Sequence, residues 1–150
     1  MSEACPTSMT AKQEAERLMN ELVPFAKRML TENGCFLPFG GYINEQGEVV
    51  HMGAQIEGEE YSLPSDLLRV LRKELVDLAR SGKAWATGVV FDVTVAVPPA
   101  KVKSDAIEID LDHRGDYSVR VYYPYTIEVN GTCVFAPIFA SEGDGGVFVV

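Results

Sequence analysis

The stretch SGKAWATGVVFDVTVAVPP, residues 81–99, decides the fold, because the periodicity of the sequence changes there. Before it, apolar residues recur every three or four positions, which is the spacing of a helix. Over residues 89–97 they occupy alternate positions instead, which is the spacing of a strand. Pro98 and Pro99 end this strand, since proline cannot donate a ladder hydrogen bond. The stretch therefore predicts a helix followed by a long strand.

Two helices are predicted before this strand. The first covers residues 10–33, where Thr10 and Gln13 form a capping-box pattern in front of an apolar stripe. Pro24 is expected to kink this helix without ending it. The second helix is predicted over residues 64–82, with leucines along one face and Ser81-Gly82 as its stop.

Strands are predicted around the second helix at residues 36–43, 48–56, 106–112, 117–123 and 132–139, with a bend at Pro124. The order helix, two strands, helix and then strands lacks a βαβ alternation. It predicts an α+β fold with a mainly antiparallel sheet of five to six strands and two helices. Profilin-like and roadblock-like domains show the same element order. We expect a flexible leader (1–9), one domain (10–142) and a tail or final short strand (143–150).

We expect the two helices to cover one face of this sheet. The opposite face would be open to solvent or covered by a second copy of the chain. It would carry these polar side chains: Thr94, Glu108, Asp110, Asp112, Arg120 and Tyr122. The three acids are interpreted as a solvated face, because the glycine and bidentate glutamate of a calcium loop are missing.

Charge and cysteine content limit the partners and the compartment. The chain has 13 Lys and Arg against 22 Asp and Glu, a formal net charge of −9, which repels nucleic acid and anionic membrane surfaces. No apolar run reaches the roughly 18 residues of a spanning helix. Three cysteines without C-x-x-C spacing and a start that lacks the features of a secretory signal favour the cytoplasm.

No motif in the sequence requires a particular chemistry. Asp112, His113 and Cys133 could form a nucleophilic set, but Asp112 and His113 are adjacent on a predicted strand and so point to opposite faces. A metal site would need His51 and His113 to converge, and no spacing supports this. We therefore expect no catalytic residue, metal or cofactor, and a Cys- or metal-dependent hydrolase is the least favoured hypothesis.

Two aromatic clusters and one arginine supply the candidate binding residues: Phe36, Phe39 and Tyr42 in the first cluster, and Arg120, Tyr122 and Tyr125 in and beside the second. Exposed Tyr and Arg side chains often dominate protein interfaces. The leading hypothesis is a non-enzymatic interaction module, a homodimer that meets a protein partner. In one version it is an immunity-type protein that masks a basic toxin. The alternative is a small-molecule sensor, with a pocket between the first helix and the strand at residues 36–42.

Several short segments also resemble those of small bacterial proteins of uncharacterised role. The segments are Phe36-x-Pro38-Phe39-Gly40, Asp105-Ala106-Ile107, Asp112-His113-Arg114-Gly115, Pro124-Tyr125 and Phe135. The resemblance spans roughly residues 36–139. It implies a bacterial cytoplasmic protein and brings no catalytic residue with it.

Overall fold

The computed structural model describes residues 10–53 and 63–148. Its elements are α1 (Ala11–Asn33), β1 (Phe39–Asn44), β2 (Val49–Gly53), α2 (Pro64–Arg80), β3 (Ala84–Val97), β4 (Val102–His113), β5 (Tyr117–Ile127), β6 (Cys133–Phe135), β7 (Phe139–Glu142) and the 3-10 helix η1 (Gly146–Phe148). The predicted α+β class and element order are confirmed. The predicted leader and the end of the predicted strand 48–56 lie outside the described residues.

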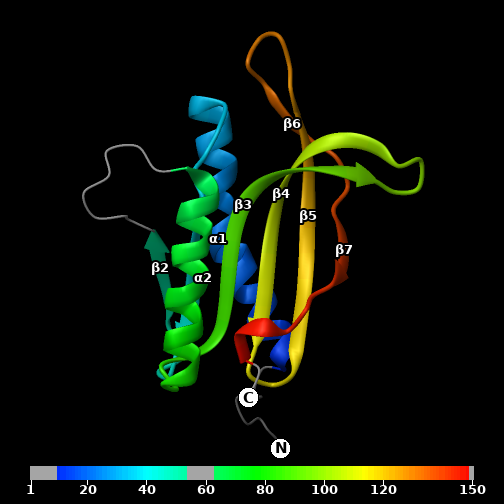
Figure 1. Cartoon of the computed structure of the whole chain (residues 1–150). Helices are drawn as coiled ribbons and strands as arrows, with labels where there is room; N and C mark the ends of the chain where they lie inside the picture. The colour runs from blue at the N-terminus through cyan, green and yellow to red at the C-terminus, as the bar shows by residue number, and fades with distance from the viewer. Residues whose placement is uncertain (1–9, 54–62, 149–150) are drawn as a thin grey trace, which may run out of the picture.

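The strands form one seven-stranded antiparallel sheet (Figure 1). Its order is β2-β1-β3-β4-β5, and β6 and β7 both pair with the far edge of β5. β3 and β4 make the longest hairpin, in which Ala86 lies opposite His113 and Val97 lies opposite Val102. β3 also pairs with β1, so it joins the first hairpin to the rest of the sheet.

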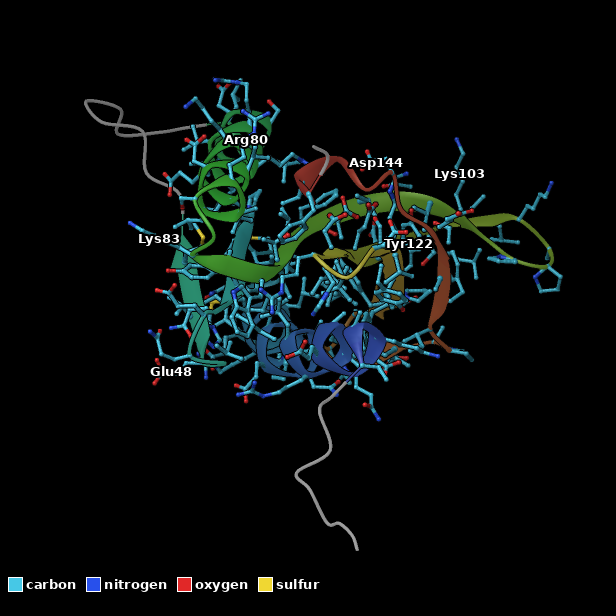
Figure 2. The ribbon with its side chains drawn as sticks, turned by 90° about the horizontal axis from the view of Figure 1, so that it is seen from below. Glu48, Arg80, Lys83, Lys103, Tyr122 and Asp144 are labelled. Atoms are coloured by element: carbon cyan, nitrogen blue, oxygen red, sulfur yellow. The ribbon has the colours of Figure 1, made fainter. Side chains whose placement is uncertain are left out.

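The two helices lie on opposite faces of the sheet (Figure 2). Val90, Ile109 and Val121 are neighbours in the register and pack in the core with α1. The side chains that alternate with them point to the other face, of which α2 covers one part. The expectation that both helices cover one face is therefore wrong. β3 carries valines on both faces, and each face needs its own cover.

Thr94 also lies on a different face from the one expected. It is opposite Asp105, which is opposite Tyr125, and Tyr125 belongs to the core on the α1 face. Arg120 and Tyr122 lie opposite Asp110 and Glu108 on the other face. The strand register, which the sequence does not specify, separates Thr94 from them.

Glycines at the centre of the sheet let α1 approach the sheet closely and let β1 pair tightly with β3. Gly41 lies opposite Gly88, and an added Cβ on either residue would come within 2.9 Å of a methyl group of Leu22 in α1. A Cβ on Gly40 would lie 2.5 Å from the carbonyl oxygen of Gly88 and 3.7 Å from Leu75 of α2. Both leucines are fully buried. The bare backbone of Gly41 and Gly88 thus receives Leu22 of α1, and the missing side chain of Gly40 lets β1 lie close to β3.

The ends of α1 follow the sequence prediction. The Gln13 N–H donates to Thr10 Oγ1 at 3.1 Å, and the Thr10 N–H donates to Gln13 Oε1 at 2.9 Å. The helix passes through Pro24 and ends at Gly34, whose φ of 76° lies in the left-handed region that glycine tolerates. Local sequence signals are therefore sufficient to define this helix.

β5 continues through Pro124, where the sequence predicted a bend. The Pro124 carbonyl accepts a hydrogen bond from the Ala136 N–H at 2.9 Å on the outer edge of the strand. The ring nitrogen faces the same edge, and β6 has ended at Phe135, so no ladder donor is missing there. The predicted strand 132–139 is divided into β6 and β7 around Pro137.

The segment 143–148 folds over the face that α2 leaves uncovered. Within these residues the chain forms η1, which packs against α2. The end of the predicted tail or final short strand (143–150) lies outside the described residues. The Gly145 N–H donates to Ser118 Oγ at 3.0 Å and fixes the segment to β5. Among the described helices, none is both long and apolar enough to cross a membrane.

The close approach at Gly40 leads to a stability prediction. We expect Gly40→Ala to lower the free energy of unfolding by about 3 kcal/mol, the upper end of the usual cost of overpacking, because β1 would have to move away from β3. The measurement is urea unfolding followed by circular dichroism. Gly53→Ala is the matched control, since a Cβ there has no neighbour within 4 Å among the residues that the structure describes. Equal stability of the two variants would contradict the packing argument.

Candidate functional site

An apolar groove lies between the last turns of α1 and the first turns of α2. Its volume is about 1010 Å³. Large apolar side chains from α1, α2, β3 and the segment before β1 form most of its lining: Phe25, Met29, Phe36, Leu37, Phe39, Leu67, Leu68 and Phe91. These elements meet here because β1 pairs with β3 at the Phe39 end, close to the end of α1. We call this feature the apolar groove.

Three phenylalanine rings fix the α1 side of the apolar groove. Phe39 is 8% exposed, and its ring contacts Phe25 and Phe36 edge to face, with centroids 5.0 and 6.1 Å away. Such geometry is the favourable one for aromatic pairs. Phe25 is 38% exposed and Leu37 is 62% exposed. The groove therefore combines a packed aromatic floor with apolar side chains that reach solvent.

Asp92 is a polar group on the wall of the apolar groove. The hydroxyl of Tyr125 donates to Asp92 Oδ1 at 2.8 Å from the neighbouring part of the sheet. Burial raises the pKa of Asp92 and the pKa of Tyr125. Tyr125, itself only 5% exposed, thus orients this carboxyl group and does not form an exposed aromatic surface.

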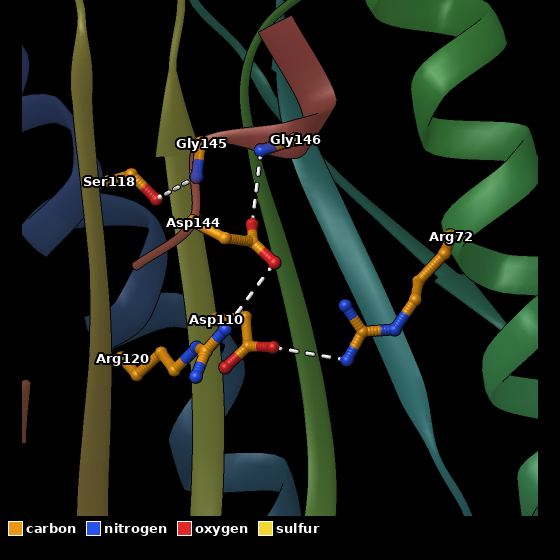
Figure 3. A network of polar contacts seen from close by, with 7 residues as sticks. All are labelled: Arg72, Asp110, Ser118, Arg120, Asp144, Gly145 and Gly146. Atoms are coloured by element: carbon orange, nitrogen blue, oxygen red, sulfur yellow. Dashed lines mark hydrogen bonds and ion pairs between the residues drawn. The ribbon is translucent and has the colours of Figure 1, made fainter. Parts of the chain in front are cut away.

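A second, polar pocket of about 180 Å³ lies where α2, β4, β5 and the segment 143–147 meet. Figure 3 shows its polar contacts. Arg72 Nη2 donates to Asp110 Oδ2 at 3.1 Å, and Arg120 Nη2 donates to Asp144 Oδ2 at 3.3 Å. The Gly146 N–H donates to Asp144 Oδ1 at 3.0 Å and lowers the pKa of Asp144. Two ion pairs therefore join three separate parts of the chain.

The acids of β4 are buried, so their interpretation as a solvated face is wrong. Glu108 is 8% exposed and Asp112 is 7% exposed. Arg72, from α2, and the segment 143–148 lie over this part of the sheet. Burial, together with the negative charge of Asp110, raises the pKa of Glu108 to about 8. Burial also raises the pKa of Asp112.

Three buried side-chain oxygens on this face have no hydrogen-bond partner among the described residues. They are Thr87 Oγ1, Asp110 Oδ1 and Asp112 Oδ1. Thr87 lies directly opposite Asp112 in the β3–β4 register, and Asp110 is two residues from Asp112 on the same face. Buried polar atoms are nearly always paired in folded proteins, so this group of oxygens requires an explanation.

The six predicted binding residues do not form one surface. Phe36 and Phe39 line the apolar groove, and Tyr125 orients Asp92. The other three lie on the opposite face: Tyr42, Arg120 and Tyr122. The ring of Tyr122 stacks on Phe139 of β7 at a centroid distance of 4.8 Å. This face is therefore partly covered by the chain itself.

His113 ties the first turn of α1 to the sheet. It is 7% exposed, and its Nε2 lies 2.7 Å from Glu14 Oε1. The Gly115 N–H donates to His113 Nδ1 at 2.8 Å, which requires an unprotonated Nδ1. The imidazole is therefore neutral and donates from Nε2 to Glu14. Both ring nitrogens already have partners within the fold.

Asp112, His113 and Cys133 do not converge. Asp112 and His113 point to opposite faces of β4, as expected. Cys133 pairs with the end of β5 opposite to the end that pairs with His113, about ten residues or roughly 33 Å along the strand. Burial also raises the pKa of the Cys133 thiol. His51 is exposed on β2, and no group of three metal-ligating side chains occurs in the described parts of the chain.

Sequence reasoning missed Phe25, Arg72 and Asp144. Phe25 lies outside the apolar stripe of α1. A large apolar residue on the polar side of a helix is a signal that could have indicated a binding residue. For Arg72 and Asp144 no signal was available, because their partners are 38 and 24 residues away in the sequence.

The raised pKa of Glu108 predicts a pH dependence of stability. The folded chain holds this proton up to about pH 8, whereas an ordinary Glu loses it near 4.5, so stability falls as the pH rises between these values. Each pH unit in this interval contributes up to about 1.4 kcal/mol. We expect Glu108→Gln to remove this part of the slope in urea unfolding, and exposed Glu128→Gln to retain it. Parallel profiles for Glu108→Gln and the unaltered chain would contradict the assignment.

Comparison of the chain with protein-family models, curated proteins and solved structures gave no match.

Proposed function

We propose that this protein is a non-enzymatic interaction module that binds an amphipathic segment of another protein in the apolar groove. The observation that carries the proposal is exposed apolar surface around a packed aromatic floor. Leu37 is 62% exposed and Phe25 is 38% exposed, and both line the groove. Contiguous apolar surface of this kind commonly marks an interaction site.

The dimensions of the apolar groove favour a protein segment over an enclosed small molecule. Small-molecule pockets commonly measure about 300–1,000 Å³ and bury most of the ligand. This groove lies at the upper limit of that range, and Leu37 remains largely exposed at its rim. An amphipathic helix can place several apolar side chains in such a groove at once.

The charge of the chain favours a basic partner. A net charge of −9 attracts a cationic protein over long distances and speeds association. The partner segment would then carry apolar residues for the groove and Lys or Arg residues around them. An immunity-type protein, which masks a basic toxin, would meet such a partner.

A small-molecule sensor that uses the same groove is the second candidate. Asp92 favours it, because Tyr125 holds this carboxyl group in place on an otherwise largely apolar lining. A few oriented polar groups among apolar side chains are typical of ligand pockets. The ligand would be a mainly apolar molecule with one hydrogen-bonding group for Asp92.

Site-specific photo-crosslinking separates these candidates. We expect Leu37→p-benzoylphenylalanine, made in the cells that normally produce the protein, to give one discrete crosslinked protein on irradiation. Val129→p-benzoylphenylalanine is the control, since Val129 is fully exposed in the hairpin between β5 and β6. Intact-mass analysis reports a protein adduct, a second copy of the chain or a small-molecule adduct in the same experiment.

The crosslinked partner then allows a quantitative test. We expect Leu37→Asp to weaken binding of the purified partner by at least about tenfold, which corresponds to about 1.4 kcal/mol. Val129→Asp should leave the affinity unchanged. A small-molecule adduct at Leu37 would favour the sensor. Identical products at Leu37 and Val129, or none at Leu37, would refute a binding role for the groove.

A further inference from the structure

We propose that the polar pocket binds the primary ammonium group of an alkylamine. The pocket lies between α2, β4, β5 and the segment 143–147, and its lining is distinct from that of the apolar groove. The inference goes beyond the proposed interaction function and does not depend on it. Three properties of the pocket carry it: its acceptor atoms, its charge and its shape.

Unpartnered acceptor oxygens are the first property. Asp112 lines the pocket, is 7% exposed, and its Oδ1 has no partner among the described residues. Asp110 Oδ1 is also buried without a hydrogen-bond partner among the described residues. Thr87, whose Oγ1 is likewise unpartnered there, lies opposite Asp112 in the register. A primary ammonium has three N–H donors and no acceptor. It therefore matches the two carboxylate oxygens, which can only accept hydrogen bonds when ionised.

The charge of the pocket is the second property. Three carboxylates and two guanidinium groups line it: Asp110, Asp112, Asp144, Arg72 and Arg120. With all five groups ionised, one negative charge is left over, and a single monovalent cation neutralises it. An uncompensated buried charge is costly, so binding of the cation is favourable. A metal ion is a poorer match, since no cluster of three metal-ligating side chains occurs within residues 10–53 and 63–148.

The shape of the pocket is the third property. Val76 of α2 and Val147 of η1 form apolar walls beside the carboxylates. A volume of about 180 Å³ holds roughly six groups of the size of a water molecule, at about 30 Å³ each. A four-carbon chain with a terminal ammonium satisfies both the apolar walls and this limit. Free amines and lysine side chains share this chemistry.

An acidic approach leads to the pocket. A neighbouring cavity of about 710 Å³ shares Asp112 with it and is also lined by Asp116, Glu142 and Asp144. Arg114 is its one permanently cationic lining residue. Clefts lined by one sign of charge concentrate ligands of the opposite sign. The approach thus selects cations before they reach the buried oxygens.

A pair of ligands of equal charge tests the proposal on the unaltered protein. We expect millimolar n-butylammonium to shift the backbone amide resonances of Ser118, Asp112 and Gly145 in a saturable manner. n-Butyltrimethylammonium has the same charge and no N–H donor, and should bind at least about tenfold more weakly. Equal binding of both ligands, or no saturable shift with n-butylammonium, would overturn the proposal.

A third ligand distinguishes a lysine side chain from a free amine as the source of the alkylammonium group. Nα-acetyl-lysine amide carries the same four-carbon ammonium on a peptide-like backbone. Binding as tight as that of n-butylammonium would identify the site as one for a lysine side chain. Binding of n-butylammonium alone would identify a free amine as the ligand. Either result is independent of crosslinking at Leu37, so it can fail or succeed separately from the proposed function.

Two charge-matched variants locate the site. Asp112→Asn keeps the shape of the side chain and removes its charge, and should weaken n-butylammonium binding by at least about tenfold. Asp77→Asn removes an equal charge from the exposed face of α2 and should leave binding unchanged. Thermal unfolding establishes that both variants are folded. Unchanged binding by folded Asp112→Asn would refute the site, and if that variant does not fold, the ligand pair on the unaltered protein decides.

Discussion

The contact of Leu22 with the bare backbone of Gly41 and Gly88 is the constraint on which the rest of the structure depends. Any side chain at these positions would displace α1 from the sheet. Gly40 has a different role, because a Cβ there would clash with the Gly88 carbonyl oxygen within the sheet and would make only an ordinary contact with Leu75 of α2. Because one helix is centred on each face, neither face is fully covered. The apolar groove forms where the two helices leave β1 and β3 exposed, and the polar pocket forms where α2 leaves β4 and β5 exposed.

Signals that act within a few residues were sufficient to predict much of the fold. Thr10 and Gln13 define the start of α1, and the periodicity change near Gly82 separates α2 from β3. Packing between distant elements was not predictable in this way. Val89 and Val90 are both apolar, so the pattern of β3 fits a sheet covered on either face or on both. The burial of Asp112 depends on α2 and the C-terminal segment, which are distant in the sequence. Acids at alternate positions of β4 are equally consistent with a buried and with a solvent-exposed strand face.

In the candidate sites, too, local sequence signals predicted some residues, and packing between distant elements determined the others. Phe36 and Phe39 were predicted as binding residues because their side chains are aromatic, and they do line one site. Their neighbours in that site come from α2 and β3, which only the fold brings to them. Arg72 connects the two sites physically: its guanidinium lies over the ring of Phe91, a groove residue, and donates to Asp110, a pocket residue.

The division of the last strand into β6 and β7 has a consequence for the behaviour of the protein at high concentration. A long unpaired edge of a sheet is a template on which another chain can add a strand, and aggregation begins at such edges. Here the strands beyond β5 are three and four residues long, and Pro137 lies between them. Proline lacks the N–H that an incoming strand would need. This side of the sheet is therefore protected against edge-to-edge growth, even though the chain is rich in β-branched residues.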